Sequence, residues 1–182
     1  VFLNLQDKLK GKTLIYAGSY TNITAISNLL LSKCKEKREP LLGAFSQWLG
    51  RNYDPGWVLP LLIKRGIGIH NGKLHRSLSQ IQVKLFEEKT GLDRLISTSS
   101  IIEGVNTSAE NVIVWATTGR GLSFSNFSYK NLIGRAGRMF KHFIGNIYVL
   151  AKKPEDKETQ LDIPFPEEIL GTLDKDRYNQ DL

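Results

Sequence analysis

The stretch TLIYAGSYTNITAISNLLL, residues 13–31, contains the alternation that decides the fold. Its opening letters, TLIYA, form an apolar run that is typical of a buried strand. Beyond them, Ile23, Ile26 and Leu30 recur at the spacing of one helical face. Thr21 precedes this face as a candidate N-cap. Because a strand that leads into an amphipathic helix is the repeating unit of parallel sheets, the stretch predicts an α/β domain.

The same alternation continues along the chain. A second amphipathic helix is predicted at residues 74–88 by apolar residues on one face, namely Leu74, Leu78, Ile81 and Leu85. Further strands are predicted at residues 66–70, 94–98, 111–115 and 146–150, and a further helix at 128–140. Because these strands are apolar at consecutive positions, we expect a parallel sheet with helices on both faces, a three-layer α/β sandwich. Ligands of such sheets bind at the carboxyl ends of the strands.

Two segments depart from this rhythm. Residues 36–65 contain three prolines, three glycines and two tryptophans, and we expect an inserted helical pair there. Residues 154–182 are acidic and contain three prolines, which is typical of a linker. The sequence therefore predicts one domain over residues 1–153, with a tail at 154–182 that leads to a further domain.

Composition excludes several classes of protein. The chain of 182 residues has a single cysteine, Cys34, so it forms no internal disulfide and no cysteine-cluster zinc site. Its three histidines lie in separate segments, and we expect no metal site in this chain. No apolar run approaches the roughly 18 residues of a membrane span, and no secretory signal is evident, so we expect a cytoplasmic protein with no membrane partner. Because the sequence begins with Val1, we expect it to be a piece of a longer chain.

Charge is distributed unevenly. Residues 1–150 contain 20 Lys and Arg against 9 Asp and Glu, a net charge of +11, whereas residues 151–182 contain 5 against 9, a net charge of −4. A strongly basic body is typical of proteins that bind nucleic acid or nucleotide phosphates, but it is also compatible with generic solubility. Charge alone therefore leaves both interpretations open.

One apparent phosphate motif fails. Gly11-Lys12-Thr13 matches the end of a P-loop, but the first glycine of that motif would fall on Gln6. A P-loop also needs a strand before it and a helix after it, whereas Thr13 begins a predicted strand. No apolar strand ends in Asp-Glu either. The chain alone is therefore not expected to build a complete magnesium–ATP site.

The segment NLIGRAGR, residues 131–138, carries the strongest chemical signal. Arg135 and Arg138 are three residues apart and share one face of the predicted helix. The two glycines of the segment weaken a helix by roughly 1 kcal/mol each, which suggests that another group approaches the backbone closely. Two guanidinium groups at one site suit a phosphate whose charge grows in a transition state. An exposed basic helix end that packs against a neighbour remains the alternative.

Two further segments follow predicted strands. In STSSIIEGVN, residues 97–106, hydroxyl groups and free backbone amides can hold phosphates, Gly104 permits close approach, and Asn106 can bond a sugar hydroxyl. A polar capping turn is the alternative for this segment. In residues 68–76, Gly72 can present its backbone amide to a phosphate, with Lys73 and Arg76 nearby. His70 in the same segment is expected to be a structural histidine.

The order and spacing of these segments resemble the C-terminal RecA-like half of superfamily-two helicases, nearest the Ski-family DExH-box branch. The resemblance covers about residues 10–150. Residues 13–19 resemble motif IV, residues 97–109 with Glu-Gly-Val-Asn resemble motif V, and residues 131–138 resemble motif VI. The family's usual His-His-x-Gly is similar to His70-Asn71-Gly72 here. The sequence departs from the family at Asn131, where Gln or His is usual.

The resemblance implies a RecA-like lobe that closes with an N-terminal lobe of the same parent chain around ATP. Arg135 and Arg138 would then act as arginine fingers on the γ-phosphate, and the missing lobe would hold Mg²⁺. Gly104, Asn106 and Asn131 would contact the nucleotide. The resemblance also implies a channel for single-stranded RNA or DNA, lined by Ser19, Gly72, Lys73, Arg76, Thr98 and Ser99. Such contacts to phosphates and sugars are indifferent to base identity.

Two other functions compete with a helicase motor lobe. A non-motor RecA-like module could bind nucleic acid or a protein without ATP-driven movement, but it would not need the arginine pair. A nucleotide-sugar or methyl-transfer enzyme would need a glycine-rich loop after the first strand, where the sequence has only Gly18. The sequence does not distinguish RNA from DNA as the substrate.

In the full-length parent protein, Arg138→Ala is expected to lower ATP hydrolysis by roughly 10³-fold or more, because an arginine finger stabilises transition-state charge. Single-strand binding is expected to persist. Phosphate release and fluorescence anisotropy measure the two properties. The 182-residue chain alone is expected to show negligible turnover. Normal turnover by the variant, or robust turnover by the chain alone, would contradict the assignment.

Overall fold

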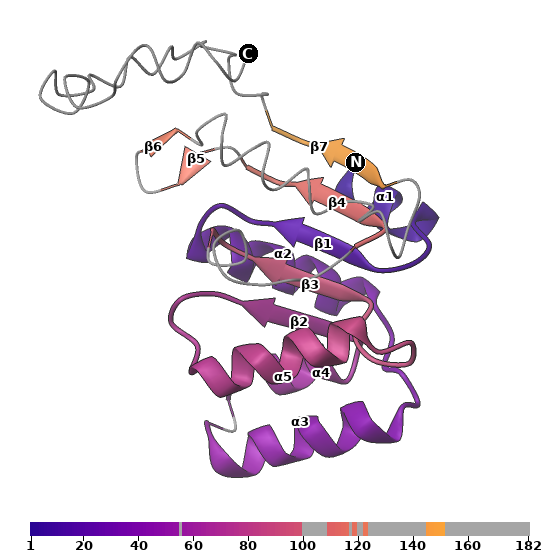
Figure 1. The fold of residues 1–182 in the computed structure, drawn as a ribbon, viewed down its shortest axis with the longest axis vertical. Coiled ribbons are helices and arrows are strands. Elements are labelled where there is room, and N and C mark those ends of the chain that lie inside the picture. Colours follow the sequence, from indigo (N-terminus) through magenta and orange to yellow (C-terminus); the bar gives the residue numbers. More distant parts are fainter. Residues whose placement is uncertain (55, 100–108, 117, 120–121, 124–144, 152–182) are drawn as a thin grey trace, which may run out of the picture.

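In a computed structural model, five parallel strands form one sheet (Figure 1). The structure describes residues 1–54, 56–99, 109–116, 118–119, 122–123 and 145–151. The sheet has the order β2-β3-β1-β4-β7, and all four neighbouring pairs are parallel. Its strands are β1 (Thr13–Tyr16), β2 (Ile67–His70), β3 (Arg94–Ser97), β4 (Asn111–Val114) and β7 (Asn146–Val149). The five predicted strands and their parallel arrangement are therefore confirmed, each to within one residue at either end.

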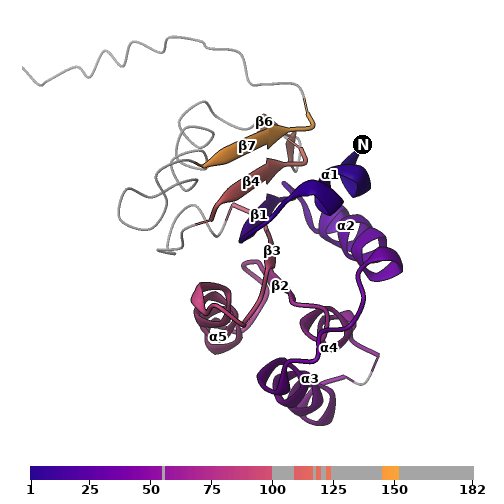
Figure 2. The ribbon, with the colours of Figure 1, turned by 90° about the vertical axis from the view of Figure 1, so that its right-hand side faces the viewer.

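Helices cover both faces of the sheet, as Figure 2 shows. On one face lies α5 (Arg76–Glu87), which contacts β2. On the other lie α1 (Phe2–Lys8), α2 (Tyr20–Lys33) and α4 (Val58–Ile63), with α3 (Pro40–Asn52) packed outside α4. This is the three-layer, RecA-like α/β architecture that was predicted.

Four of the five strands are buried, apart from Arg94 at the start of β3. All four residues of β1, β2 and β4 are buried, and the core continues into the inward faces of α2, α4 and α5. Burial on both faces explains why these strands are apolar at consecutive positions rather than at alternate ones. The edge strand β7 differs, because Ile147 and Val149 remain 37% exposed.

The interrupting segment contains two helices, as predicted. Pro40 begins α3, where its missing N–H costs nothing because the first amides of a helix have no intrahelical partner. Pro60 lies in the first turn of α4 for the same reason. The hydroxyl of Ser46 on α3 donates to the carbonyl of Pro60 at 2.7 Å, which ties the two helices together in the interior.

Several sequence predictions were wrong in detail. Ser19, not Thr21, caps α2, so this helix begins one residue before the expected N-cap. The helix predicted at 74–88 begins at Arg76, and Ile81 is 39% exposed rather than buried. The short helix α1 and a two-stranded antiparallel ribbon, β5 (Thr118–Gly119) with β6 (Leu122–Ser123), were not predicted. The predicted helix at 128–140 and the tail at 154–182 lie outside the described residues.

None of the helices that the structure describes has the length and apolar character needed to cross a membrane.

A side chain completes the hydrogen bonding of edge strand β2. Gln82 on α5 is fully buried, and its Oε1 accepts from the backbone N–H of Ile69 at 2.8 Å while its Nε2 donates to the carbonyl of Leu78 at 3.2 Å. Gly68 makes this approach possible, because a Cβ there would lie 2.7 Å from Leu92 Cδ1 and 3.1 Å from Gln82 Oε1. The amide therefore takes the place of a neighbouring strand on this side of β2.

Gln82→Met is expected to lower the free energy of unfolding by about 1–3 kcal/mol, because it leaves the buried N–H of Ile69 without an acceptor while conserving side-chain size. Gln80→Met, at an exposed position of the same helix, is the control and should change stability by less than about 0.5 kcal/mol. Urea unfolding measures both. Equal stability of the two variants would refute the role of Gln82.

Candidate nucleic-acid interface at the carboxyl edge of the sheet

The parallel register aligns the ends of the central strands. His70, Ser97, Tyr16 and Val114 are the last residues of β2, β3, β1 and β4, and they lie opposite one another across the sheet. The turns that follow β2, β3 and β1 contain all six of the predicted strand-binding residues: Ser19, Gly72, Lys73, Arg76, Thr98 and Ser99. Adjacent parallel strands thus bring three separate sequence segments to one edge of the sheet (Figure 1).

The turn after β1 is shaped by local hydrogen bonds. Gly18 has φ +77°, a conformation that favours glycine, and it directs the chain from β1 into α2. The hydroxyl oxygen of Ser19 then accepts from the backbone N–H of Asn22 at 3.2 Å. The side chain of Asn22 donates back to the carbonyl of Ala17 at 2.8 Å. Ser19 is therefore a helix cap first, and its hydroxyl keeps a hydrogen to donate.

Backbone N–H groups in the turn after β2 donate to side chains of the same turn. Oδ1 of Asn71 accepts from the backbone N–H of Lys73 at 2.9 Å and from that of Leu74 at 3.2 Å. Nδ1 of His75 accepts from the N–H of Ser77 and caps α5. The backbone N–H of Lys73 is therefore already hydrogen-bonded, and its exposed side chain is the group that remains available to bind a ligand.

Gly72 occupies an open position in the same turn. A Cβ added there would meet only the hydroxyl oxygen of Tyr20, at 3.9 Å, and the backbone is not in the left-handed region. Packing within the described part of the chain therefore does not require glycine here. The predicted close approach of a ligand to this backbone is sterically open.

Lys73 joins the first two turns. Its ammonium group lies 4.5 Å from the centroid of the Tyr20 ring, which is within the range of a cation–π contact. Tyr20 is the first residue of α2, so the contact links the turn after β1 to the turn after β2. Arg76 is exposed at the first residue of α5 and adds a second cation beside Lys73.

The turn after β3 is less accessible than expected. Thr98 is only 8% exposed, and its backbone N–H donates to the carbonyl of His70 at 3.3 Å, so this amide is not available for a phosphate. Ser99 is exposed. Ser97, one of the hydroxyl residues of the predicted phosphate-binding segment, is fully buried, and its Oγ has no hydrogen-bond partner among the described residues.

Two titratable groups lie in this row. Burial raises the pKa of Tyr16 to about 12, so its phenol stays neutral. Burial also lowers the pKa of His70, which is 6% exposed at the end of β2, so its neutral form is favoured. Such an environment agrees with the expectation of a structural histidine.

The predicted nucleotide contacts lie elsewhere in the chain. Gly104, Asn106, Asn131, Arg135 and Arg138 fall outside the described residues. Among the residues that are described, no group of three or more His, Cys, Asp or Glu side chains could hold a metal ion.

The rejection of the P-loop match is confirmed. Gly11 has φ +80° and forms a turn, and Thr13 begins β1 at the amino edge of the sheet. The ammonium group of Lys12 donates to the carbonyls of Glu88 and Leu92, at 2.6 and 2.7 Å. These bonds hold Lys12 on the opposite edge from the turns described above.

Comparison with known proteins gives two sequence relatives and a fold. No model of a known protein family matches the chain. The chain is 36% identical to Anti-bacteriophage protein B of Escherichia coli strain K12 over 141 residues, which is 73% of this chain and 19% of that protein. It is 28% identical to DNA polymerase theta of Caenorhabditis elegans over 137 residues, or 75% of this chain and 8% of that protein. The chain therefore spans less than a fifth of the length of either relative.

Among solved structures, the chain is similar to the C-terminal part of the Fun30 ATPase domain. The TM-score is 0.50 with 15% sequence identity, over 84% of this chain and 38% of that one. This similarity supports the same RecA-like fold.

The pH dependence of stability provides a test of the buried state of His70. Its pKa lies below the ordinary value of 6.5 in the folded chain, so the unfolded chain binds the proton first. Stability is then expected to fall as the pH drops from about 7.5 to about 5.5, through the unfolded pKa towards the folded one. Urea unfolding at both pH values should show a smaller change for His70→Gln than for the parent chain. His75→Gln, at an exposed position, should keep the parent's change, and an unaltered change in His70→Gln would contradict the prediction.

Proposed function

We propose that this chain is the second motor lobe of an ATP-dependent nucleic-acid helicase or translocase of the Ski-family DExH-box branch, and that its carboxyl edge forms part of the single-strand channel. The observation that carries the proposal is the meeting of three predicted turns on the adjacent strands β2, β3 and β1. The RecA-like fold supports it, as does the similarity to Anti-bacteriophage protein B and DNA polymerase theta.

The turns provide the chemistry that a translocating motor needs. Lys73 and Arg76 are exposed cations that can neutralise neighbouring phosphates, and the cation–π contact to Tyr20 restrains Lys73 in the turn. Gly72 leaves room for a sugar–phosphate backbone to approach. Ser99 offers an exposed hydroxyl group, and Ser19 retains a donor beyond its capping role. None of these contacts depends on base identity.

The nucleotide side of the proposal rests on the sequence motifs. Arg135 and Arg138 would meet the growing charge on the γ-phosphate, and Gly104, Asn106 and Asn131 would position the nucleotide. Bound ATP supplies the phosphoanhydride bond that is hydrolysed, and an N-terminal lobe would hold its Mg²⁺. The name of one relative, DNA polymerase theta, makes DNA the first nucleic acid to test, with RNA of the same sequence beside it.

Neutralising the carboxyl-edge cations tests the channel. The double variant Lys73→Gln, Arg76→Gln is expected to weaken single-strand binding at low salt for every sequence, and to reduce the salt slope of log K by about 1.4, because roughly 0.7 is lost per phosphate contact. Fluorescence anisotropy over a salt series measures both. Ala25→Glu with Asn28→Glu, at exposed positions of α2, changes the net charge by the same amount and is the control.

If the carboxyl-edge variant binds a single strand like the parent, the channel assignment is wrong. If it binds weakly while ATP hydrolysis in the full-length parent is unaffected by Arg138→Ala, the chain belongs to a non-motor binding module instead.

A further inference from the structure

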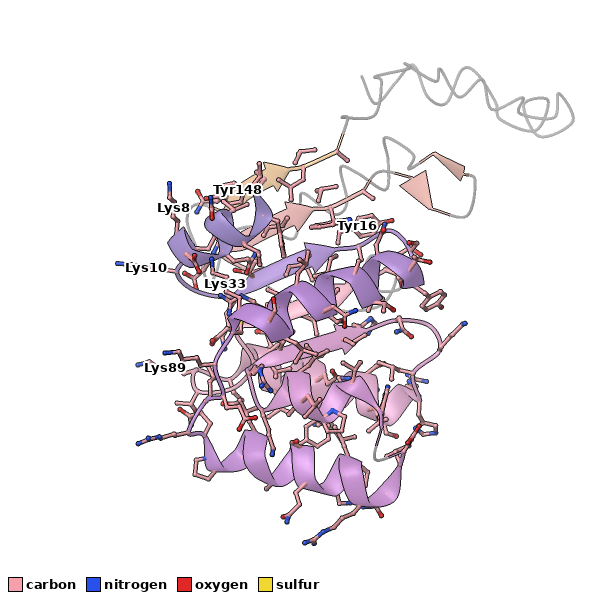
Figure 3. All side chains as sticks on the ribbon, turned by 180° about the vertical axis from the view of Figure 1, so that it is seen from behind. Lys8, Lys10, Tyr16, Lys33, Lys89 and Tyr148 are labelled. Carbon is pink, nitrogen blue, oxygen red and sulfur yellow. The ribbon has the colours of Figure 1, made fainter. Side chains whose placement is uncertain are left out.

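The amino edge of the sheet carries a second concentration of positive charge. Two depressions of about 260 and 440 Å³ adjoin there and share Asp93 and Arg94 in their linings. Eight lysine and arginine side chains line the pair, against three carboxylates, those of Asp7, Asp93 and Glu110. Figure 3 shows Lys8, Lys10, Lys33 and Lys89 along this edge, on the side where the strands begin. The described residues thus place a basic surface opposite the carboxyl-edge turns.

The carboxylates of this surface are already engaged. Asp7 pairs with Lys33 at 2.5 Å, and Asp93 pairs with Lys37 at 2.7 Å. Glu110 accepts from the backbone N–H of Lys12 at 3.2 Å. Two of the three carboxylates are thus paired with Lys33 and Lys37, and none of the three forms an ion pair with Lys10, Lys35 or Lys89 among the described residues.

Three lysines remain available. Lys10, Lys35 and Lys89 are exposed and form no ion pair within the part of the chain that the structure describes. They come from three loops, which follow α1, α2 and α5 respectively. Lys35 lines the smaller depression, and the other two line the larger one. The free charge is thus distributed along the edge rather than gathered at one point, which suits a polymer with repeated negative charges better than a single small anion.

A buried donor lies beside the smaller depression. Gln6 lines it and is 4% exposed, and its Oε1 accepts from Nε of Arg94 at 2.5 Å. Nε2 of Gln6 has no hydrogen-bond partner among the described residues. An unpaired buried amide is unfavourable, so an acceptor that enters from the depression would be favoured. Phosphate oxygens are acceptors of this kind and also pair with the neighbouring lysines.

We propose that the amino edge binds the phosphate backbone of a nucleic acid, as a contact surface separate from the channel at the carboxyl edge. The two edges lie at opposite ends of the same strands, so a strand or duplex on the amino edge would be held independently of the one in the channel. The proposal does not require the channel assignment to hold.

Neutralising the free lysines tests this surface. The triple variant Lys10→Gln, Lys35→Gln, Lys89→Gln is expected to weaken binding of a labelled duplex and of a single strand, and to reduce the salt slope of log K by about 2–3. The charge-matched control replaces exposed residues of α2 and α3 by glutamate: Ala25→Glu, Asn28→Glu and Gln47→Glu. It should keep the parent's slope. Urea unfolding should show that all variants stay within about 0.5 kcal/mol of the parent, since only exposed side chains change.

The outcomes separate the two surfaces. If the triple variant binds nucleic acid more weakly while the double variant Lys73→Gln, Arg76→Gln binds like the parent, the amino-edge proposal is supported and the channel assignment is overturned. The opposite result overturns the amino-edge proposal. Loss in both, with additive free energies in the combined variant, supports two independent surfaces. Equal loss in the charge-matched control would show that net charge alone is responsible and would overturn the proposal. Competition by polyglutamate as strong as by nucleic acid would instead indicate an acidic protein partner.

Discussion

The parallel ladder of β1 with β3 and β4 is the constraint on which the other features depend. β1 lies in the middle of the described sheet, and its four residues pair in register on both sides, so that Leu14 lies opposite Leu95 and Val112. Every strand of this sheet therefore begins at one edge and ends at the other. Both faces must then be covered by helices, which explains the fully buried strand residues and the position of α5 opposite α2.

This constraint also separates two kinds of chemistry. Turns that follow the strands gather hydroxyl groups, an open glycine and two exposed cations at the carboxyl edge. Loops that precede the strands gather lysines and paired carboxylates at the amino edge. Lys12 illustrates the separation, because its ammonium group is committed to two backbone carbonyls and burial lowers its pKa. It therefore serves to join the loop before β1 to the loop before β3 and is not a ligand-binding group.

The sequence predicted β1, β2 and β4 well because burial on both faces leaves short runs of consecutive apolar residues between turn residues. The sequence predicted the cap of α2 and the buried face of α5 less well, because tertiary contacts determine both. Thr21 and Ser19 both have a side chain that can cap a helix, and in the structure the chain enters α2 directly after Gly18, so that Ser19 is the cap. Ile81 fits the apolar period of α5, but the face of α5 that the sheet covers is centred on Gln82 and Phe86.

The residues of the candidate sites also divide into those that a sequence pattern predicts and those that only the tertiary structure reveals. Gly72, Lys73 and Arg76 were predictable because they lie within five residues where a predicted strand leads into a predicted helix. The burial of Ser97 was not, since only tertiary packing distinguishes a buried hydroxyl at a strand end from an exposed one. The amino-edge surface was not predictable either, because Lys10, Lys35 and Lys89 belong to no motif and share one edge only because three separate loops return to it.

Gly72 and Gly68 differ in a way that bears on function. At Gly68 the chain itself requires glycine, since a Cβ would collide with Leu92 and Leu95. At Gly72 the fold makes no such demand, as the nearest described atom to a Cβ is 3.9 Å away. The open glycine lies near two exposed cations at the end of a parallel strand, so the fold leaves room there for the partner that we propose at the carboxyl edge.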